Sequence, residues 1–469
     1  MLKKLKNLIA VLSAILTVFT VFACGTPEPT GGGRKKSGGG GEDEIVLDEG
    51  GEEGGDGGNT DPEPPAPLAP LPQRMLIGAW APYFGNGAQA NFDDIADAGF
   101  TFLMPMQYQM DFASNSSAAE TILNHSYAAG LRVMVQDSGL SINGVWNTSN
   151  VGKYINHPSF MGNFIKDEPA PGEFPALKTK HDNYKLVFPS DKVFFVNLYP
   201  YNDPAIGFTT YNNYLEGCLN TVGTEWLSYD NHVLMSNGSI MSSYLTNLHL
   251  AAVMAKTHSV PLHNFVLSVP HTAGNNNFRA PSLADTRWQA AVNQAYGVRG
   301  FTYFTYMSPW ENGYGEALVK ANGEKTALYG YAKTVNNEIL AWDDVYLSYK
   351  WQKTLGVNRS GTSSWTTIFS STINRQQSGT VSGTSGIKSV VPTREVLLGC
   401  FENAGGGKAF MLTNGSNPND NYTSSVQIEF DGYTSVKVYT KGVPSVMPLT
   451  SGKITIDLES GEGKFLIPL

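Results

Sequence analysis

Two adjacent carboxylates, Asp167 and Glu168, are the residues of this chain best suited to acid–base chemistry. They follow an apolar run, Phe164 and Ile165, which predicts a short buried strand, and they precede Pro169. A proline ends strand pairing and biases the residue before it, here Glu168, to an extended conformation. A strand that ends on a carboxylate is typical of the catalytic rim of a (β/α)₈ barrel. The alternative is that both acids begin the next helix, where the helix dipole favours negative charge.

Such acids could cleave a glycosidic bond, a reaction that needs two carboxyl groups, one protonated and one ionised. Crowding beside a second acid would raise the pKa of Glu168, which suits this residue to the role of general acid. Asp230 follows the apolar run Trp226–Tyr229 and is the best second carboxyl, expected to act as base, nucleophile or assisting group. Glu311 and Glu316 are weaker candidates, because both could equally be solvated loop acids.

Eight short apolar runs between Met75 and Trp342 supply the strands that must position these acids. Continuous apolar strands that alternate with amphipathic stretches indicate a parallel sheet covered by helices. A glycine-rich phosphate loop does not follow the first strand, so the pattern favours an α/β fold of the (β/α)₈ TIM-barrel type over a doubly wound open sheet. The expected strands are Leu76–Trp80, Phe100–Pro105, Leu131–Gln136, Phe164–Asp167, Val193–Leu198, Trp226–Tyr229, Phe265–Val269 and Phe301–Tyr306.

Aromatic, amide and acidic side chains follow these strands, at what would be one rim of the barrel. Aromatic faces stack on sugar rings, while amides and acids bond to sugar hydroxyls, so this rim predicts a carbohydrate-binding surface. Any single tyrosine of the set could instead be a packing residue. The expected substrate contacts are Trp80, Tyr83, Gln107, Tyr108, Asp137, Asp167, Asn197, Tyr199, Tyr229, His232, His271, Tyr306, Trp310 and Glu311.

The first residues carry the marks of an export signal. Three lysines precede an apolar run from Leu8 to Ala23, which is too short and too early for an ordinary membrane span. The run ends at Cys24 in a pattern that resembles the bacterial lipoprotein signal, in which this cysteine is lipidated. An ordinary secretory signal cut nearby is the alternative. We therefore expect a signal peptide over residues 1–24 and a lipid anchor at Cys24 in the bacterial cell envelope, at the outer membrane.

Residues 25–73 are predicted to be a disordered tether, because Gly, Pro and acidic residues dominate them and cannot bury enough surface to fold. This tether holds eleven acids and three bases, a charge of −8, and the three lysines of the leader add +3, so of the formal charge of −9 about −4 remains for residues 74–469. A weakly acidic surface argues against a nucleic-acid partner, which needs a basic face. We expect a monomer that binds a carbohydrate substrate.

Metal and disulfide chemistry are not expected. His232, His263 and His271 lack the spacing of metal ligands, and no cofactor motif is present. Beyond Cys24, the chain holds only Cys218 and Cys400, too few for a disulfide framework.

A second domain is predicted after the barrel, which should occupy residues 74–342. From residue 343 onward, helical periodicity gives way to short alternating runs separated by turns such as Asn414-Gly415 and Asp431-Gly432. This pattern is typical of an antiparallel β-sandwich over residues 343–469. Its expected strands are Val396–Phe401, Lys408–Thr413, Ser425–Phe430, Ser435–Tyr439, Lys453–Leu458 and Gly463–Leu469.

Three stretches carry a resemblance to a known group of enzymes: Asp167–Pro169, Tyr229 with Asp230, and Arg287–Phe304. They resemble the glycoside-hydrolase barrels of clan A, above all the bacterial family 42-like, β-galactosidase-like group, many of them lipoproteins of Bacteroidetes. The region from Gly399 to the terminal strand is similar to the small β-domain behind such barrels. The resemblance spans residues 75–469 and implies a glycoside hydrolase.

The sequence departs from the clan A pattern in two places. An Asn normally precedes the acid, where this chain has Asp167, and the usual Glu at the end of strand 7 is missing from Phe265–His271. Leu227–Asp230 is also similar to the strand-6 motif of the family 18 chitinases, in which an acetamido group of the substrate attacks. We therefore keep two hypotheses: a glycoside hydrolase that uses Glu168 and Asp230, or a non-catalytic glycan-binding lipoprotein on a degenerate barrel. A third, weaker hypothesis is a scaffold or adhesion protein in which the β-domain does the binding.

Overall fold

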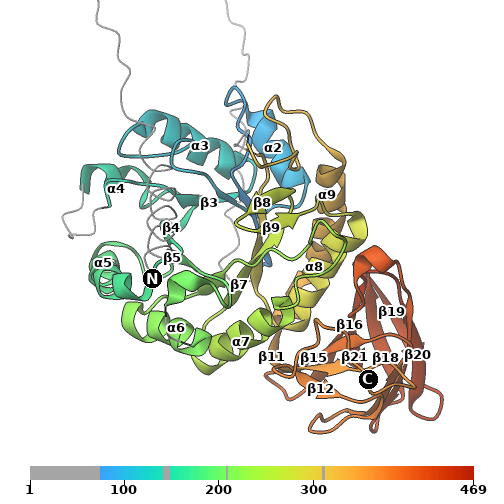
Figure 1. Cartoon of the computed structure of the whole chain (residues 1–469). Helices are drawn as coiled ribbons and strands as arrows, with labels where there is room; N and C mark the ends of the chain where they lie inside the picture. Colours follow the sequence, from blue (N-terminus) through green and yellow to red (C-terminus); the bar gives the residue numbers. More distant parts are fainter. Residues whose placement is uncertain (1–73, 141–147, 208–209, 309–311) are drawn as a thin grey trace, which may run out of the picture. The chain divides into compact units, whose positions relative to one another are not determined.

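The computed structural model describes residues 74–140, 148–207, 210–308 and 312–469. Eight parallel strands close into a barrel in the order β1-β10-β7-β6-β5-β4-β3-β2 (Figure 1). All eight predicted strands are confirmed, with small differences at their ends. The barrel strands are β1 (Leu76–Trp80), β2 (Phe102–Met104), β3 (Arg132–Val135), β4 (Phe160–Asp167), β5 (Val193–Leu198), β6 (Leu227–Tyr229), β7 (Leu262–Leu267) and β10 (Gly300–Phe304).

Helices surround the barrel, as expected for a (β/α)₈ fold (Figure 1). Gly297 follows the helix that ends at Ala295 and has φ of +76°, a left-handed conformation that a glycine adopts without a steric penalty at a helix end. The helices are α2 (Gln89–Asp97), α3 (Ser116–Ala128), α4 (Thr148–Tyr154), α5 (Phe174–Val187), α6 (Tyr211–Gly217), α7 (Tyr244–Thr257), α8 (Leu283–Ala295), α9 (Ala327–Leu340) and α10 (Asp343–Leu347). The described part of the chain contains no helix of the length and apolarity that a membrane span requires.

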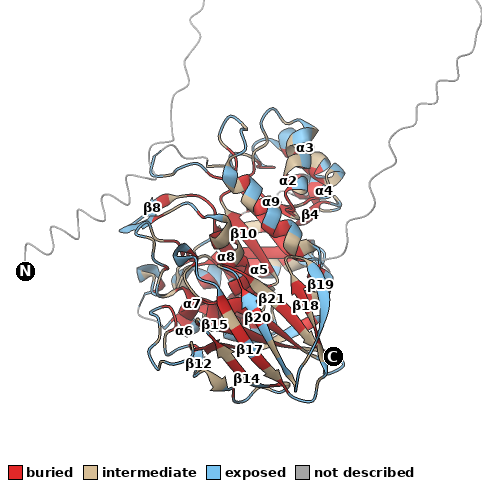
Figure 2. Ribbon diagram, turned by 90° about the vertical axis from the view of Figure 1, so that its right-hand side faces the viewer, coloured by how far each residue is buried: buried red, intermediate tan, exposed pale blue. Residues whose placement is uncertain are grey.

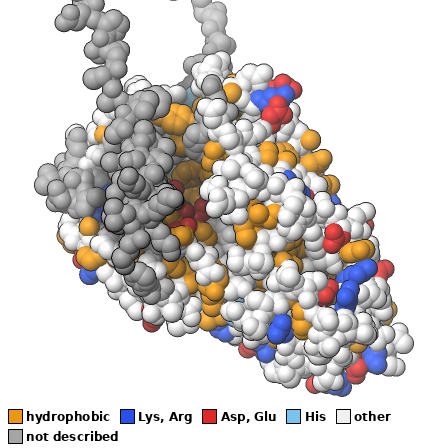
Figure 3. Space-filling view, viewed as in Figure 1, with side chains coloured by type: hydrophobic (Ala, Val, Ile, Leu, Met, Phe, Trp, Pro, Cys, Tyr) orange, Lys and Arg blue, Asp and Glu red, His pale blue; other side chains and the backbone are white. Residues whose placement is uncertain are grey.

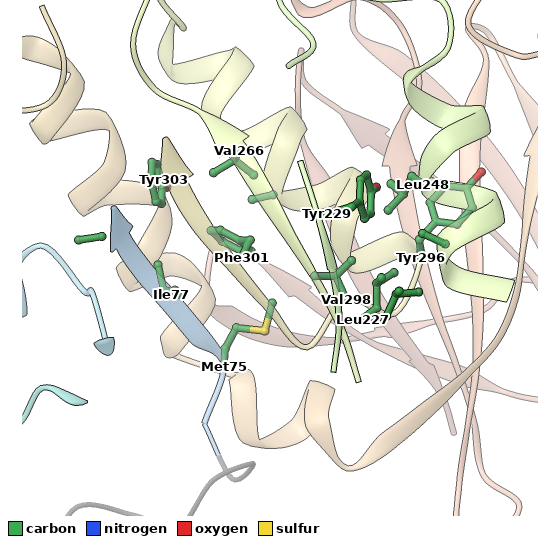
Figure 4. Packing of buried hydrophobic residues seen from close by; sticks show 14 of the residues in the cluster. Met75, Ile77, Leu227, Tyr229, Leu248, Val266, Tyr296, Val298, Phe301 and Tyr303 are labelled. Carbon is green, nitrogen blue, oxygen red and sulfur yellow. The ribbon is translucent and has the colours of Figure 1, made fainter. Parts of the chain in front are cut away.

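The barrel strands bury both of their faces in separate clusters. One cluster is built almost entirely from strand residues, such as Leu76, Phe102 and Phe195, and fills the barrel interior. The other joins alternate strand residues, such as Ile77 and Tyr303, to the surrounding helices (Figure 4). Successive strand side chains point to opposite faces, so the cluster to which a residue belongs shows which way it points.

The C-terminal region forms two sheets, which confirms the predicted β-sandwich. One has the strand order β12-β11-β15-β16-β21-β18-β19 and the other β13-β14-β17-β20. All six predicted strands are present, and the sequence missed β11, β12, β13, β14 and β19. The strands are β11 (Tyr349–Val357), β12 (Asn374–Gln376), β13 (Gly379–Thr380), β14 (Ile387–Pro392), β15 (Val396–Asn403), β16 (Lys408–Asn414), β17 (Ser424–Phe430), β18 (Ser435–Thr440), β19 (Val443–Pro448), β20 (Lys453–Leu458) and β21 (Gly463–Pro468).

The larger sheet packs on helix α8 of the barrel. The hydroxyl of Thr413 donates to the carbonyl of Ala291 over 3.3 Å, and that of Thr354 donates to Ala295 over 2.7 Å. At the far edge of this sheet, every residue of β19 is exposed (Figure 2). Cys218 and Cys400 are both free and buried.

Candidate active site

A β-bulge in β4 determines where the acidic pair points. Phe164 lies opposite Phe195 of β5, and the next paired residue is Lys166, so Ile165 is an extra residue in the strand. An extra residue reverses the alternation of side chains beyond it. Because Phe164 packs against the interior cluster, the bulge turns Asp167 rather than Lys166 toward the inside of the barrel.

A glycine permits the close approach of β4 to β5. Gly162 has φ of +155°, and a Cβ atom built on it would lie 2.2 Å from the carbonyl oxygen of Val193. No side chain fits at that distance, so only glycine allows β4 to take this path.

Asn197, at the end of β5, joins two of the predicted site residues. Its side-chain nitrogen donates to the carboxylate of Asp167 over 3.2 Å and to that of Asp230 over 3.3 Å. The amide has two N–H groups, so it can serve both carboxylates at once. The structure thus brings together Asp167, Asn197 and Asp230 from the ends of β4, β5 and β6.

Glu168 has an unusual backbone. Its φ is +46°, in the left-handed region, so the expected extended conformation before Pro169 is wrong. Two tertiary hydrogen bonds hold this conformation: the Glu168 N–H donates to the Asn197 carbonyl over 2.8 Å, and the Tyr214 hydroxyl donates to the Pro169 carbonyl over 2.8 Å. No side chain in the described residues hydrogen-bonds to the Glu168 carboxyl group, which leaves it available to a ligand.

Burial and mutual repulsion raise the pKa values of these acids. Burial, followed by the charges of Asp230, Asp167 and Asp203, raises the pKa of Glu168 to about 9. Burial and the charge of Asp167 raise the pKa of Asp230 to about 7, against the hydrogen bond from Asn197. The pKa of Asp167 is also raised, because neighbouring barrel atoms limit the hydration of its carboxylate, although Asp167 as a residue is exposed at the end of β4. Figure 3 shows acidic atoms beside hydrophobic ones in a hollow near the middle of the barrel.

A chain of buried hydrogen bonds continues from Asn197 across the barrel. The Ser228 hydroxyl donates to the Asn197 side-chain carbonyl over 2.9 Å, so His263 Nδ1, 3.0 Å away, must donate to Ser228. His263 Nε2 then accepts from the Thr302 hydroxyl at 3.0 Å. Burial lowers the pKa of His263 to about 3, which keeps the ring neutral in this arrangement. We call Asn197, Ser228, His263 and Thr302 the barrel relay.

Two predicted aromatic contacts lie near the acids. Tyr199 follows the end of β5, and its pKa is raised to about 12 by burial and then by the charge of Glu168. Trp80 packs edge-on against Phe164, with ring centroids 5.2 Å apart, and is buried in the barrel interior. In the described structure its buried indole Nε1 has no hydrogen-bond partner.

His232 and His271, both predicted substrate contacts, lie together with ring centroids 4.6 Å apart. His271 stacks on Tyr314 at 5.1 Å, and its Nδ1 lies 3.0 Å from the carbonyl of Val269. Burial lowers the pKa of His232 to about 3 and also lowers that of His271, so both rings are neutral. Over the described ranges, no group of three or more His, Cys, Asp or Glu side chains is arranged to hold a metal ion.

Two predicted contacts are wrong. Tyr229 is fully buried in the cluster between strands and helices, beside Leu248 and Tyr296 (Figure 4). Its neighbour Ser228 points into the barrel, so the alternation of β6 turns Tyr229 outward. Tyr306 is likewise buried, 2% exposed, in the same outer cluster, so neither side chain can contact a sugar.

The other predicted contacts are spread around the rim. Tyr83 is partly buried against Gly323, and Tyr108 is 67% exposed. Gln107 and Asp137 line one cavity, with the Asp137 carboxylate accepting from the Tyr154 hydroxyl over 2.9 Å.

The remaining predicted residues have other outcomes. Glu316 is exposed and lies 3.4 Å from Lys320, an ion pair that fits a solvated loop acid. Trp310, Glu311 and Cys24 lie outside the described residues, as do the predicted signal peptide and tether.

Sequence reasoning missed Ser228 and Lys180 and dismissed His263. Ser228 interrupts an apolar strand, and Lys180 interrupts the apolar stripe of α5, so each broke a local pattern that could have drawn notice. His263 gave no such signal, because its role depends on partners from three other strands.

Comparisons with known proteins agree on the fold. No known protein-family profile matches the sequence, and no curated protein matches it either. The solved structure of a family 42 β-galactosidase from G. stearothermophilus, a catalytic mutant, matches with TM-score 0.54 and 7% identity, over 85% of this chain and 98% of that one.

Two further solved structures are similar. A β-galactosidase from Bacillus circulans sp. alkalophilus gives TM-score 0.51 and 9% identity over 85% and 99% of the two chains. A structure described as a glycoside hydrolase gives 0.51 and 12% over 84% and 92%. These three neighbours are two β-galactosidases and a glycoside hydrolase, and the likeness shows that the chain shares their fold.

Proposed function

We propose that the protein is a glycoside hydrolase in which Glu168 is the general acid. Asp230 serves as base, nucleophile or assisting group, and the substrate is an oligo- or polysaccharide. The likeness in fold to glycoside hydrolases supports the class of reaction. The residue roles rest on the geometry and electrostatics of the site.

The observation that carries the proposal is the separation of two carboxyl pKa values at one rim. Glu168, with its pKa near 9, is protonated at neutral pH and can donate to a leaving-group oxygen. Asp230 titrates near 7 and is held by an Asn197 N–H, so it is the carboxyl that ionises first. Two carboxyls whose environments push their pKa values apart are the acid and base that glycoside cleavage needs.

No carboxylate directly follows β7, and the second carboxyl group of the site is therefore assigned to Asp230, after β6. The Ser268 hydroxyl donates to the carbonyl of Thr305 over 2.9 Å, and His271 follows with a neutral ring. Neither can act as a carboxylate nucleophile. Asp230 therefore takes the second role, either directly or by orienting an acetamido group of the substrate.

The test is a screen of the full chain against chromogenic glycosides and glycans, with three variants. We expect Glu168→Gln and Asp230→Asn each to lose at least about a hundredfold in kcat/KM, the scale of a lost acid or base. Glu316→Gln, a matched change at an exposed acid, should keep full activity. The anomer released, followed by NMR, separates retention from inversion. Full activity in either active-site variant would overturn the assignment.

A non-catalytic glycan-binding protein is the second candidate, and the missing carboxylate at the end of β7 favours it. On this reading the barrel binds glycans through the same rim and hydrolyses none. Glycan-array binding by the full chain, together with no released sugar over the whole screen, would select it.

We also propose that the chain is a monomer anchored by lipid at Cys24 in the bacterial cell envelope. The basic leader, apolar run and cysteine support the proposal. Incorporation of labelled palmitate in a bacterial host should be lost in Cys24→Ser, and light scattering of residues 74–469 should give a monomer mass. Equal labelling of the variant would exclude the anchor.

A further inference from the structure

Lys180 occupies a position of helix α5 at which an apolar residue is expected. The buried residues of α5 are spaced three or four apart and form the stripe that faces the barrel. Lys180 belongs to that stripe and is only 7% exposed. Lysine is almost never this deeply buried unless its charge is paired. The buried members of the stripe are Phe174, Leu177, Lys180, His181 and Tyr184.

The ammonium group of Lys180 has no partner in the described structure, by hydrogen bond or by ion pair. Its neighbour His181 differs, because His181 Nε2 lies 3.0 Å from the carboxylate of Glu225. The negative charge that acts on Lys180 is that of Asp137. Both oxygens of Asp137 already accept hydrogen bonds, from the Tyr154 hydroxyl and from the Gly139 N–H, each over 2.9 Å.

Lys180 lines a cavity of about 320 Å³ on the β3–β4 side of the barrel. Phe164 and Ile165 form part of its wall, and the same strand ends two residues later at Asp167. The cavity therefore adjoins the candidate active site. The other lining residues are Gln107, Gln136, Asp137, Ser138 and Leu140.

We propose that this cavity binds an anionic substituent of the sugar, a carboxylate or a sulfate ester, with Lys180 as its counter-charge. The inference rests on the proposed function and narrows the substrate to acidic glycans. An ammonium group offers three donors, and the amides of Gln107 and Gln136 add neutral ones. Charge-assisted hydrogen bonds of this kind are about twice as strong as neutral ones. Ligand binding thus supplies the partner that Lys180 lacks.

The experiment is calorimetric titration of the full chain carrying Glu168→Gln, so that binding is measured without hydrolysis. The probes are galacturonate, galactose 6-sulfate, galactose and the methyl ester of galacturonate. We expect one acidic probe to bind at least about tenfold more tightly than galactose and than the neutral ester. The carboxylate and sulfate probes decide which anion the cavity takes. Equal binding of the acidic and neutral probes would overturn the proposal, and this comparison needs no change at Lys180.

Variants on α5 then test the residue itself. Lys180→Met should remove the preference for the acidic probe over galactose, whereas Lys180→Arg should keep that preference. Lys178→Met, at an exposed lysine of the same helix, is the matched control. An unchanged preference in Lys180→Met would overturn the assignment of Lys180. Because binding is read without turnover, absence of hydrolysis in the wild-type chain would count against the proposed function alone.

Discussion

The Ser228 hydroxyl donates to the side-chain carbonyl of Asn197 over 2.9 Å. This bond fixes which end of the Asn197 amide faces the acids, because a flipped amide would turn its oxygen toward two carboxylates. Its two N–H groups are therefore directed at Asp167 and Asp230. Ser228, which lies opposite Asn197 in the pairing of β5 with β6, thus determines how the rim acids are held.

Removing the Asn197 amide should shift the pH profile of the reaction. Its hydrogen bond lowers the pKa of Asp230, so Asn197→Leu should raise that pKa. We expect the acidic limb of kcat/KM against pH to move up by about one unit, as loss of a hydrogen bond to a charged group implies. Asn212→Leu, at an exposed position of α6, is the control. An unmoved acidic limb would contradict this role.

Breaking the barrel relay should reduce stability. Ser228→Ala leaves the Asn197 carbonyl and His263 Nδ1 without their buried partner. We expect a loss of about 1–3 kcal/mol in the free energy of unfolding, measured with denaturant. Ser236→Ala, at an exposed serine, should change it by less than about 0.5 kcal/mol. Equal stability of the two variants would show that the relay contributes nothing.

The raised pKa of Glu168 should make the protein less stable as pH rises. A group whose folded pKa is above its unfolded value contributes stability that is complete below the unfolded pKa, near 4.5, and is lost toward the folded pKa, near 9. Glu168→Gln removes this dependence. At pH 8 we expect the variant to be more stable than the wild type by more than about 1.4 kcal/mol, the equivalent of one pKa unit, with no such gain at pH 4.

Urea unfolding at a series of pH values checks this prediction. Glu316→Gln, at an exposed acid, should show no such trend. A difference between Glu168→Gln and the wild type that stays constant from pH 4 to 9 would contradict the raised pKa.

Gly162→Ala should damage both the fold and the site. The new methyl group would lie 2.2 Å from the Val193 carbonyl oxygen, so β4 must move away from β5. We expect a loss of about 1–3 kcal/mol in the free energy of unfolding, together with most of the hydrolytic activity. Gly172→Ala, where the added Cβ has open space, is the control and should change neither. A stable, fully active Gly162→Ala protein would refute the close approach.

The barrel could be predicted because its strands are continuous apolar runs, a pattern that does not depend on distant partners. Asp167, Glu168 and Asp230 could be placed at strand ends for the same reason, since each lies within three residues of the end of such a run. The errors at Tyr229 and Tyr306 arose because a strand end was equated with a rim position. In the three-residue strand β6, the inward direction of Ser228 sends Tyr229 the other way.

The other features of the site depend on contacts between neighbouring strands, which cannot be read from the sequence alone. The bulge at Ile165 exists only relative to β5, and the bond from Ser228 to Asn197 joins residues 31 positions apart. In the β-domain, β19 was missed because it contains Pro444 and Pro448 and is exposed throughout. Proline within a run argues against a central strand, and β19 is an edge strand.

The extra residue in β4 has a consequence for how this site could change in evolution. Loss of Ile165 by a single codon deletion would leave Lys166 opposite Val196 and Asp167 opposite Asn197, so the strand would become regular while Asp167 kept its inward direction. The acidic rim therefore survives a change in strand length. One residue of this strand is dispensable for the direction of the acid, which gives the site a tolerance to deletion that a regular strand lacks.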